Sequence, residues 1–110
     1  MISKVTYLGD LRTNATHLPS KSEFITDAPI DNQGKGEAFS PTDTVATALA
    51  SCLLTIMGIK GDYLQIDLTG TTAAVTKVMG VEPRRIIEVK IDVTFLKGFD
   101  SKTQNILERA

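Results

Sequence analysis

The hydrophobic pattern is strongest in the middle of the chain, where apolar side chains recur at helical spacing and cover almost the whole circumference of a helix. Between Pro41 and Lys60 only small Ser, Thr and Gly residues interrupt them after the first turn. A helix without a charged face belongs inside a protein or between two subunits. The pattern therefore predicts a buried or intersubunit helix here.

The ends of this helix carry recognisable signals. Ser40 offers an N-cap hydroxyl, Pro41 suits the first helical position, and Asp43 adds a carboxylate in the first turn. We therefore expect the helix to begin directly after Ser40. Gly58 and Gly61 are weak helix formers, and we expect them to end or loosen it.

Strand patterns precede the helix. Residues 3–7 and 11–16 flank Gly9-Asp10 as a hairpin would, and residues 23–26 suggest a third strand. Residues 27–39 are rich in Pro, Gly, Asp and Asn and show no periodicity, so we expect an irregular loop there.

Two further strand patterns follow the helix. Residues 65–79 predict a long strand with a bulge near Gly70. Residues 87–96 alternate strictly between apolar and polar side chains, which predicts a strand with one buried face. Ser101 then opens a capping box and a final helix that stops at Ala110 without a C-cap. The order predicts an α+β fold, with 1–110 as a single domain that lacks its natural C-terminal segment.

Composition narrows the partners and the compartment. Twelve basic and 13 acidic side chains give a formal net charge of −1, so no basic surface indicates nucleic acid. No signal peptide opens the chain, and the longest apolar run, residues 52–59, looks too short to span a bilayer. One cysteine forms no internal disulfide framework. We expect a cytoplasmic protein with neither nucleic acid nor membrane as a partner.

Cys52, the only cysteine, lies in the middle of the apolar helix. A lone cysteine in such a place is more often a small core residue than a nucleophile. His17, the only histidine, has no second Cys or His at ligand spacing, so we expect no metal site and no cofactor. Gly34-Lys35-Gly36 lacks the spacing of a phosphate-binding loop and indicates a turn.

One segment resembles a known family. Phe39-Ser40-Pro41-Thr42-Asp43, followed by Ala48-Leu49-Ala50-Ser51-Cys52, resembles the OsmC/Ohr family of osmotically inducible and organic hydroperoxide resistance proteins. The resemblance continues through residues 9–12, 26–29 and 82–86 and the final helix. It implies an intertwined α+β homodimer in which curved antiparallel sheets wrap around central helices. It also implies a Cys-based thiol peroxidase that reduces organic hydroperoxides in oxidative-stress defence.

The chemistry that the resemblance implies needs a cation near Cys52. An ordinary thiol, with a pKa of about 8.5, is only slightly ionised at neutral pH. The helix dipole offers little help, because Cys52 lies about three turns beyond Ser40. The resemblance puts Arg12 beside the reactive cysteine, where its guanidinium would stabilise the thiolate and donate to the peroxide. Cys52 would then attack the distal peroxide oxygen, release an alcohol and become a sulfenic acid.

Two departures from the family pattern affect the site. Studied members carry a Glu directly after the Pro, where this chain has Thr42 followed by Asp43. Glu37 is the nearest loop carboxylate that would take its place and orient Arg12, although the choice of carboxylate stays open. The family's resolving cysteine, in a Cys-Pro pair of the last helix, has no counterpart here, so turnover would need an external thiol.

Two other functions remain as alternatives. A dimeric OsmC-like binding module would hold a small lipophilic ligand in an apolar interface pocket. A structural or interaction protein would keep Cys52 inert. The peroxidase interpretation, with Cys52, Arg12 and Glu37 as its catalytic residues and a homodimer as its assembly, is the one we carry forward.

Overall fold

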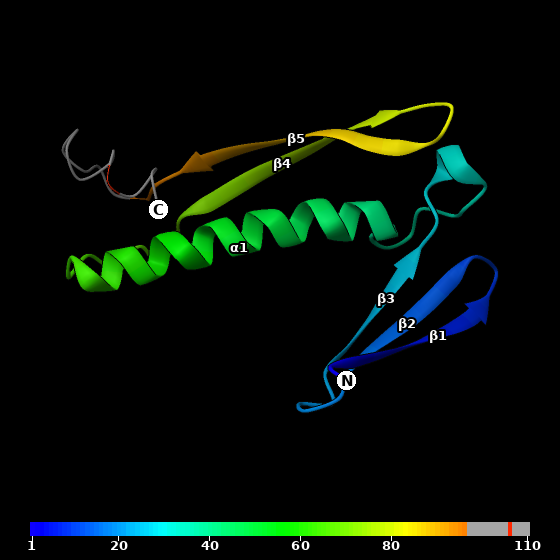
Figure 1. Cartoon of the computed structure of the whole chain (residues 1–110), viewed down its shortest axis with the longest axis horizontal. Coiled ribbons are helices and arrows are strands. Elements are labelled where there is room, and N and C mark those ends of the chain that lie inside the picture. Colours follow the sequence, from blue (N-terminus) through cyan, green and yellow to red (C-terminus); the bar gives the residue numbers. More distant parts are fainter. Residues whose placement is uncertain (97–105, 107–110) are drawn as a thin grey trace. The chain divides into compact units, whose positions relative to one another are not determined.

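The structure is a computed structural model that describes residues 1–96 and Ile106. Figure 1 shows the element order: β1 (Ser3–Gly9), β2 (Arg12–His17), β3 (Glu23–Asp27), the short 3-10 helix η1 (Ile30–Asn32), α1 (Pro41–Tyr63), β4 (Thr72–Gly80) and β5 (Arg85–Thr94). The α+β class with antiparallel sheets is confirmed. The chain divides into two compact units, Met1–Val45 and Ala46–Ala110. The expected helix from Ser101 lies outside the described residues, apart from helical Ile106.

The first unit contains a three-stranded antiparallel sheet in the order β1-β2-β3. Ala15 pairs with Val5 on one side and Phe24 on the other, so these side chains share one apolar face. The predicted hairpin is confirmed, but its turn lies one residue later than Gly9-Asp10. Asp10 and Leu11 occupy it at φ 55° and 63°. These are the left-handed angles of a two-residue hairpin turn, which Leu rarely adopts, so the sequence pattern misplaced it.

The irregular loop after β3 is confirmed, and it folds tightly on itself. The Ala28 carbonyl accepts the Gly36 N–H at 3.1 Å, and the Pro29 carbonyl accepts the Gly34 N–H at 2.9 Å. A Cβ at Gly34 would lie 1.8 Å from the Ala28 oxygen, so this close approach admits only glycine. Asp27 N–H donates to the Phe39 carbonyl at 2.9 Å and closes the base of the loop.

The start of α1 is confirmed as a reciprocal capping box. Ser40 Oγ accepts the Asp43 N–H at 3.0 Å, and the Asp43 carboxylate accepts the Ser40 N–H at 3.0 Å. Two donors that the first turn would leave without partners are thereby satisfied. Ser40 is buried, so the cap also anchors the end of the preceding loop.

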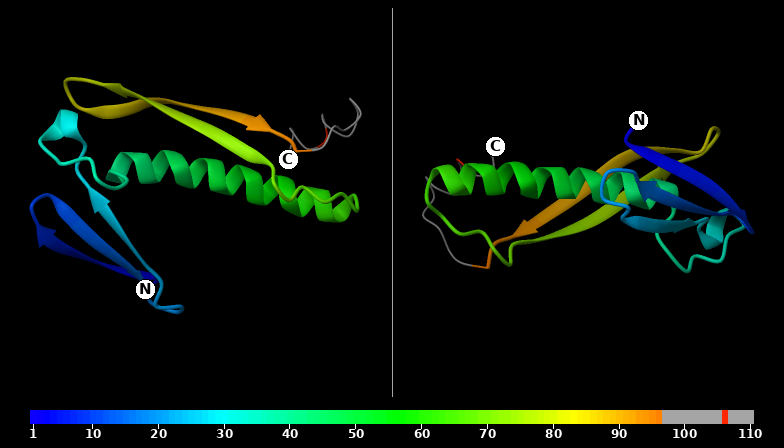
Figure 2. Two further views of the ribbon diagram at one scale, coloured as in Figure 1. Left: turned by 180° about the vertical axis from the view of Figure 1, so that it is seen from behind. Right: turned by 90° about the horizontal axis from the view of Figure 1, so that it is seen from below.

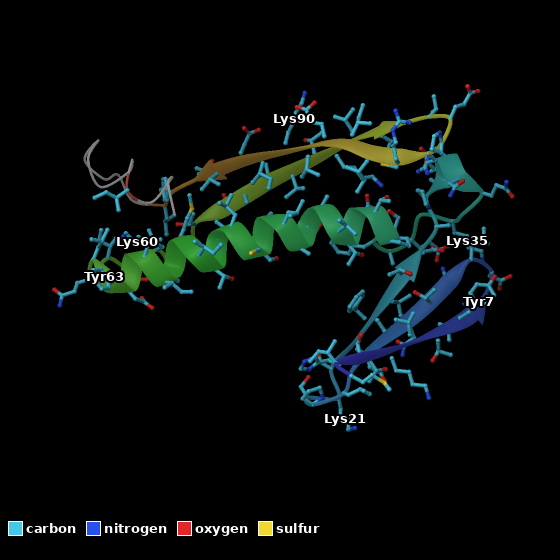
Figure 3. The ribbon with its side chains drawn as sticks, viewed as in Figure 1. Tyr7, Lys21, Lys35, Lys60, Tyr63 and Lys90 are labelled. Atoms are coloured by element: carbon cyan, nitrogen blue, oxygen red, sulfur yellow. The ribbon has the colours of Figure 1, made fainter. Side chains whose placement is uncertain are left out.

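α1 ends close to the expected place near Lys60, but neither glycine terminates it, because the helix runs through Gly58 and Gly61 to Tyr63. Gly61 is buried, and a Cβ there would lie 3.1 Å from the Ile66 carbonyl oxygen of the returning chain. The Ile66 N–H donates to the Gly61 carbonyl at 2.8 Å. Tertiary packing therefore overrides the low helix propensity of glycine. Lys60 and Tyr63, seen at this end of α1 in Figure 3, form a cation–π contact at 5.5 Å.

The strand expected over residues 65–79 is wrong in its first half. β4 begins only at Thr72, and the Asp67 side chain instead accepts the Thr69 N–H at 2.9 Å. Such local side-chain bonds compete with strand pairing and favour a turn. Gly70 lies in that turn at φ 92°, and the irregularity of β4 falls between Val78 and Met79.

The alternating pattern of β5 is confirmed from Val89 onward, whereas Ile87, at the start of the expected strand, is 56% exposed. Val89, Ile91 and Val93 are half-buried, whereas the intervening polar side chains are exposed. Figure 2 shows the β4–β5 hairpin beside α1 in both views. Leu53 and Met57 of α1 line a hollow of about 320 Å³ together with Ile91, Asp92 and Val93 of β5.

Within one chain little of α1 is buried. Its buried residues are Ala46, Ala50, Met57 and Gly61, which form a single stripe. The helix is long and apolar enough to cross a membrane by length and composition, so the expectation that no segment is long enough is wrong. Core helices of soluble proteins can be equally long and apolar. In this chain 17% of the most apolar stretch of α1 is buried. The expectation of no membrane partner stays a prediction.

Candidate functional site

Cys52 lies at the centre of an exposed apolar stripe on α1. The thiol is free and exposed within one chain, so the expected burial of this helix is not achieved by the chain itself. The stripe follows spacings of four and three residues and consists of Val45, Leu49, Cys52, Ile56, Ile59 and Tyr63. Its five other members are each at least 40% exposed. A repeat of this kind is typical of helices that pack against another helix.

Arg12 and Glu37 come together in the first unit. Arg12, at the start of β2, donates from Nη2 to Glu37 Oε2 at 2.7 Å. The Glu37 side chain is 62% exposed and the Arg12 side chain 32%. The loop carboxylate named from the sequence therefore lies where it could orient the guanidinium. Its catalytic role stays a prediction.

Asp27 is the residue that the sequence analysis missed. The last residue of β3, it is fully buried, and its Oδ2 accepts the Glu37 N–H at 3.0 Å and Arg12 Nη2 at 3.4 Å. β2 and β3 pair antiparallel with Arg12 opposite Asp27. The available signal was this register: an acidic residue directly after the expected strand 23–26 and a basic residue near the start of the expected strand 11–16.

The charges of this cluster reinforce one another. The Asp27 pKa is lowered, first because the carboxylate accepts the Glu37 backbone N–H and then because Arg12 pairs with it, with a smaller effect of Lys35. Burial opposes this shift. The Arg12 pKa is raised, mainly by the hydrogen bond that Arg12 donates to the Glu37 carboxylate and then by Asp27. Both groups are thus held in their charged forms at neutral pH.

The lowered Asp27 pKa predicts an acid limit for the first unit. The pKa of Asp27 is lower in the folded protein than in the unfolded chain, where it is about 3.9. The carboxylate therefore stabilises the fold at pH values above about 3.9, and this stabilisation is lost as the pH falls through the folded pKa. We expect the urea concentration at the unfolding midpoint to decrease as the pH is lowered below about 4. Tyr7 fluorescence in a Tyr63→Phe background reports on this unit, because the chain has no Trp and two Tyr. Asp27→Asn should flatten the pH dependence; an unchanged slope would contradict this assignment.

The other chemistry-bearing residues are placed as follows. His17 is exposed, and its Nδ1 lies 2.6 Å from Ser20 Oγ. Among the residues that the structure describes, no group of His, Cys, Asp and Glu could hold a metal ion. The hollow between α1 and β5 does not include Cys52 among its lining residues. Arg12 and Glu37 belong to the first unit and Cys52 to the second, so the pairing of Arg12 with Glu37 is observed and the place of Arg12 beside Cys52 stays a prediction.

One solved structure is closely similar to this chain. A crystal structure of a protein from Psychrobacter arcticus 273-4 matches it with a TM-score of 0.96 and 63% sequence identity. The match covers 99% of this chain and 80% of the other. That protein carries the provisional description of an osmotic stress induced and detoxification response protein. No family model and no curated protein matches the sequence. Identity at this level over nearly the whole chain reflects common ancestry as well as a common fold.

Proposed function

This chain belongs to the OsmC family, and we propose that it is a Cys-based thiol peroxidase that reduces organic hydroperoxides. The observation that carries the proposal is Cys52, a free thiol at the centre of the exposed apolar stripe of α1. An apolar environment around a nucleophilic sulfur favours alkyl hydroperoxides over hydrogen peroxide. The detoxification role in the description of the Psychrobacter protein is consistent with this chemistry.

In the proposed reaction the Cys52 thiolate attacks the distal oxygen of the hydroperoxide. The O–O bond breaks, the sulfur is oxidised to a sulfenic acid, and the proximal oxygen leaves as an alcohol after taking up a proton. Arg12 stabilises the thiolate and donates to the peroxide oxygens, while Glu37 orients Arg12. Two external thiols, in the cytoplasm, return the sulfenic acid to the thiol, because the chain has a single cysteine. The first displaces water and forms a mixed disulfide with Cys52, and the second attacks that disulfide, releasing the Cys52 thiol and an external disulfide.

The proposal includes a homodimer. The stripe on α1 leaves apolar side chains in solvent over the length of the helix, which soluble monomers rarely do. Val5 and Phe24, on the apolar face of the first sheet, are also more than half exposed. A second copy that covers these surfaces would remove Cys52 from water. The predicted intertwined arrangement therefore stays part of the proposal.

We expect the protein to form a dimer, since the α1 stripe needs a covering surface. Light scattering at micromolar concentration should report about twice the chain mass of 11.9 kDa. Leu49→Glu, in the stripe, should shift the population towards monomer. Val81→Glu serves as the matched control, because Val81 is 77% exposed and lies outside the stripe. A folded parent monomer, or equal effects of the two variants, would refute this part of the proposal.

A binding module without turnover is the second candidate. The observation that favours it is the hollow between α1 and β5, whose lining combines Leu53, Met57, Ile91 and Val93 with the polar Asp92 and does not include the thiol. Such a hollow suits a small lipophilic ligand. The rate at which Cys52 forms a sulfenate with an organic hydroperoxide separates the two candidates, since binding alone requires no reactive sulfur.

A further inference from the structure

We propose that Asp27 is the positioning residue of the Arg12–Glu37 pair. Its buried carboxylate closes the loop that carries Glu37 and fixes the guanidinium at the same time. The catalytic meaning of this role rests on the proposed function, whereas the role itself is a property of the first unit alone.

The first step is the closure of the loop. Asp27 holds residues 28–39 at two points, since its N–H donates to the Phe39 carbonyl at 2.9 Å and its carboxylate accepts the Glu37 N–H at 3.0 Å. Glu37 has no helix or strand of its own to fix its backbone. The direction of the Glu37 side chain therefore depends on the Asp27 carboxylate.

The second step compares the two partners of Arg12 Nη2. Glu37 is the nearer at 2.7 Å, and Asp27 lies at 3.4 Å. The Glu37 carboxylate is 62% exposed, however, whereas that of Asp27 is 0% exposed. Water and salt screen the exposed pair, and its side chain is free to leave. Burial thus outweighs the shorter distance, and Asp27 is the more permanent partner.

The third step concerns two polar atoms of the cluster that make no hydrogen bond within the described part of the chain. Arg12 Nε and Asp27 Oδ1 are buried, and among the described residues neither has a hydrogen-bond partner. One is a donor and the other an acceptor. Together with Nη2 and Oδ2 they are the four atoms of a bidentate guanidinium–carboxylate pair. A small rotation of Arg12 would complete that pair without Glu37, so losing Glu37 leaves Arg12 anchored.

The test follows the Arg12 Nε–H by NMR in the full, ¹⁵N-labelled chain near pH 6. Asp27→Asn keeps the shape of the side chain but removes its charge, and we expect Nε–H exchange with water to quicken about tenfold or more. Glu37→Gln should change that rate by less than about twofold. Asp10→Asn is the matched control, since Asp10 occupies the exposed hairpin turn and Asn tolerates its positive φ.

A second measurement needs no change at residue 27. In Glu37→Gln, where the side chain of residue 37 no longer titrates, the backbone amide of residue 37 should still show a titration with a midpoint below the ordinary Asp value of about 3.9. The charged groups that face Asp27 are Arg12 and Lys35, together with Glu37 in the parent. The proposal is overturned if this titration is absent, or if Glu37→Gln frees Arg12 as much as Asp27→Asn does.

The outcome is independent of the peroxidase proposal. Neither NMR measurement involves Cys52, and both should give the same result in a Cys52→Ser background. The functional arm is the pH profile of Cys52 alkylation: Asp27→Asn should shift it in the same direction as Arg12→Ala and add nothing to Arg12→Ala in the double variant. If the alkylation profile of Arg12→Ala matches that of the parent while the NMR results are as expected, the role of Arg12 towards the thiol is rejected and the positioning role of Asp27 is retained.

Discussion

Cys52→Ser is expected to abolish sulfenate formation with organic hydroperoxides, because the chain contains no other cysteine. In the parent, cumene hydroperoxide should form the Cys52 sulfenate faster than hydrogen peroxide does at equal concentration. A dimedone adduct detected by intact mass measures both rates. The product should persist as sulfenate or be oxidised further to sulfinate, without an internal disulfide.

The control for this experiment is the fold itself. Serine differs little from cysteine in volume, so Cys52→Ser should keep the circular dichroism spectrum and the assembly of the parent. The decisive comparison is with free cysteine. If the parent thiol reacts with either peroxide no faster than free cysteine, the peroxidase proposal fails and the binding module takes its place.

Arg12→Ala is expected to move the midpoint of the Cys52 alkylation profile upward by about 1–3 pH units, the usual effect of losing a close opposite charge. The midpoint is determined from rates of iodoacetamide alkylation between pH 5 and pH 10, measured at intervals of about half a pH unit. Arg12→Lys should give an intermediate shift, since it keeps the charge and loses the planar donor group.

Lys4→Ala is the control for a general change of charge, because Lys4 is an exposed cation on β1 of the same sheet. Its profile should match that of the parent. Coincident profiles of Arg12→Ala and the parent would remove Arg12 from the thiol site. Another cation, such as Lys35 or Arg84, would then have to stabilise the thiolate.

The features that sequence reasoning predicted well are local ones. The capping box joins Ser40 and Asp43, three positions apart, so the pattern contains every group that takes part. The alternation of β5 likewise matches the exposure of each residue from Val89 to Thr94. In both cases the physical cause lies within one element.

The features that sequence reasoning missed depend on distant partners. Asp27 meets Glu37 ten positions later and Arg12 fifteen positions earlier, and only the strand register brings them together. Gly61 continues the helix because Ile66 and Leu68 return against it. The family resemblance supplied roles for Arg12 and Cys52, whereas it covered residues 26–29 without assigning a role to Asp27.

Gly34 gives the site a hidden dependence on a residue without a side chain. Any substitution there would displace the Ala28 carbonyl, which lies 1.8 Å from the place of a Cβ and also accepts the Gly36 N–H. That movement would open the loop just before Glu37 and so disturb a charge cluster that Gly34 does not touch. A natural variant at this position would therefore alter the Arg12–Asp27–Glu37 cluster, although residue 34 contributes none of its charges.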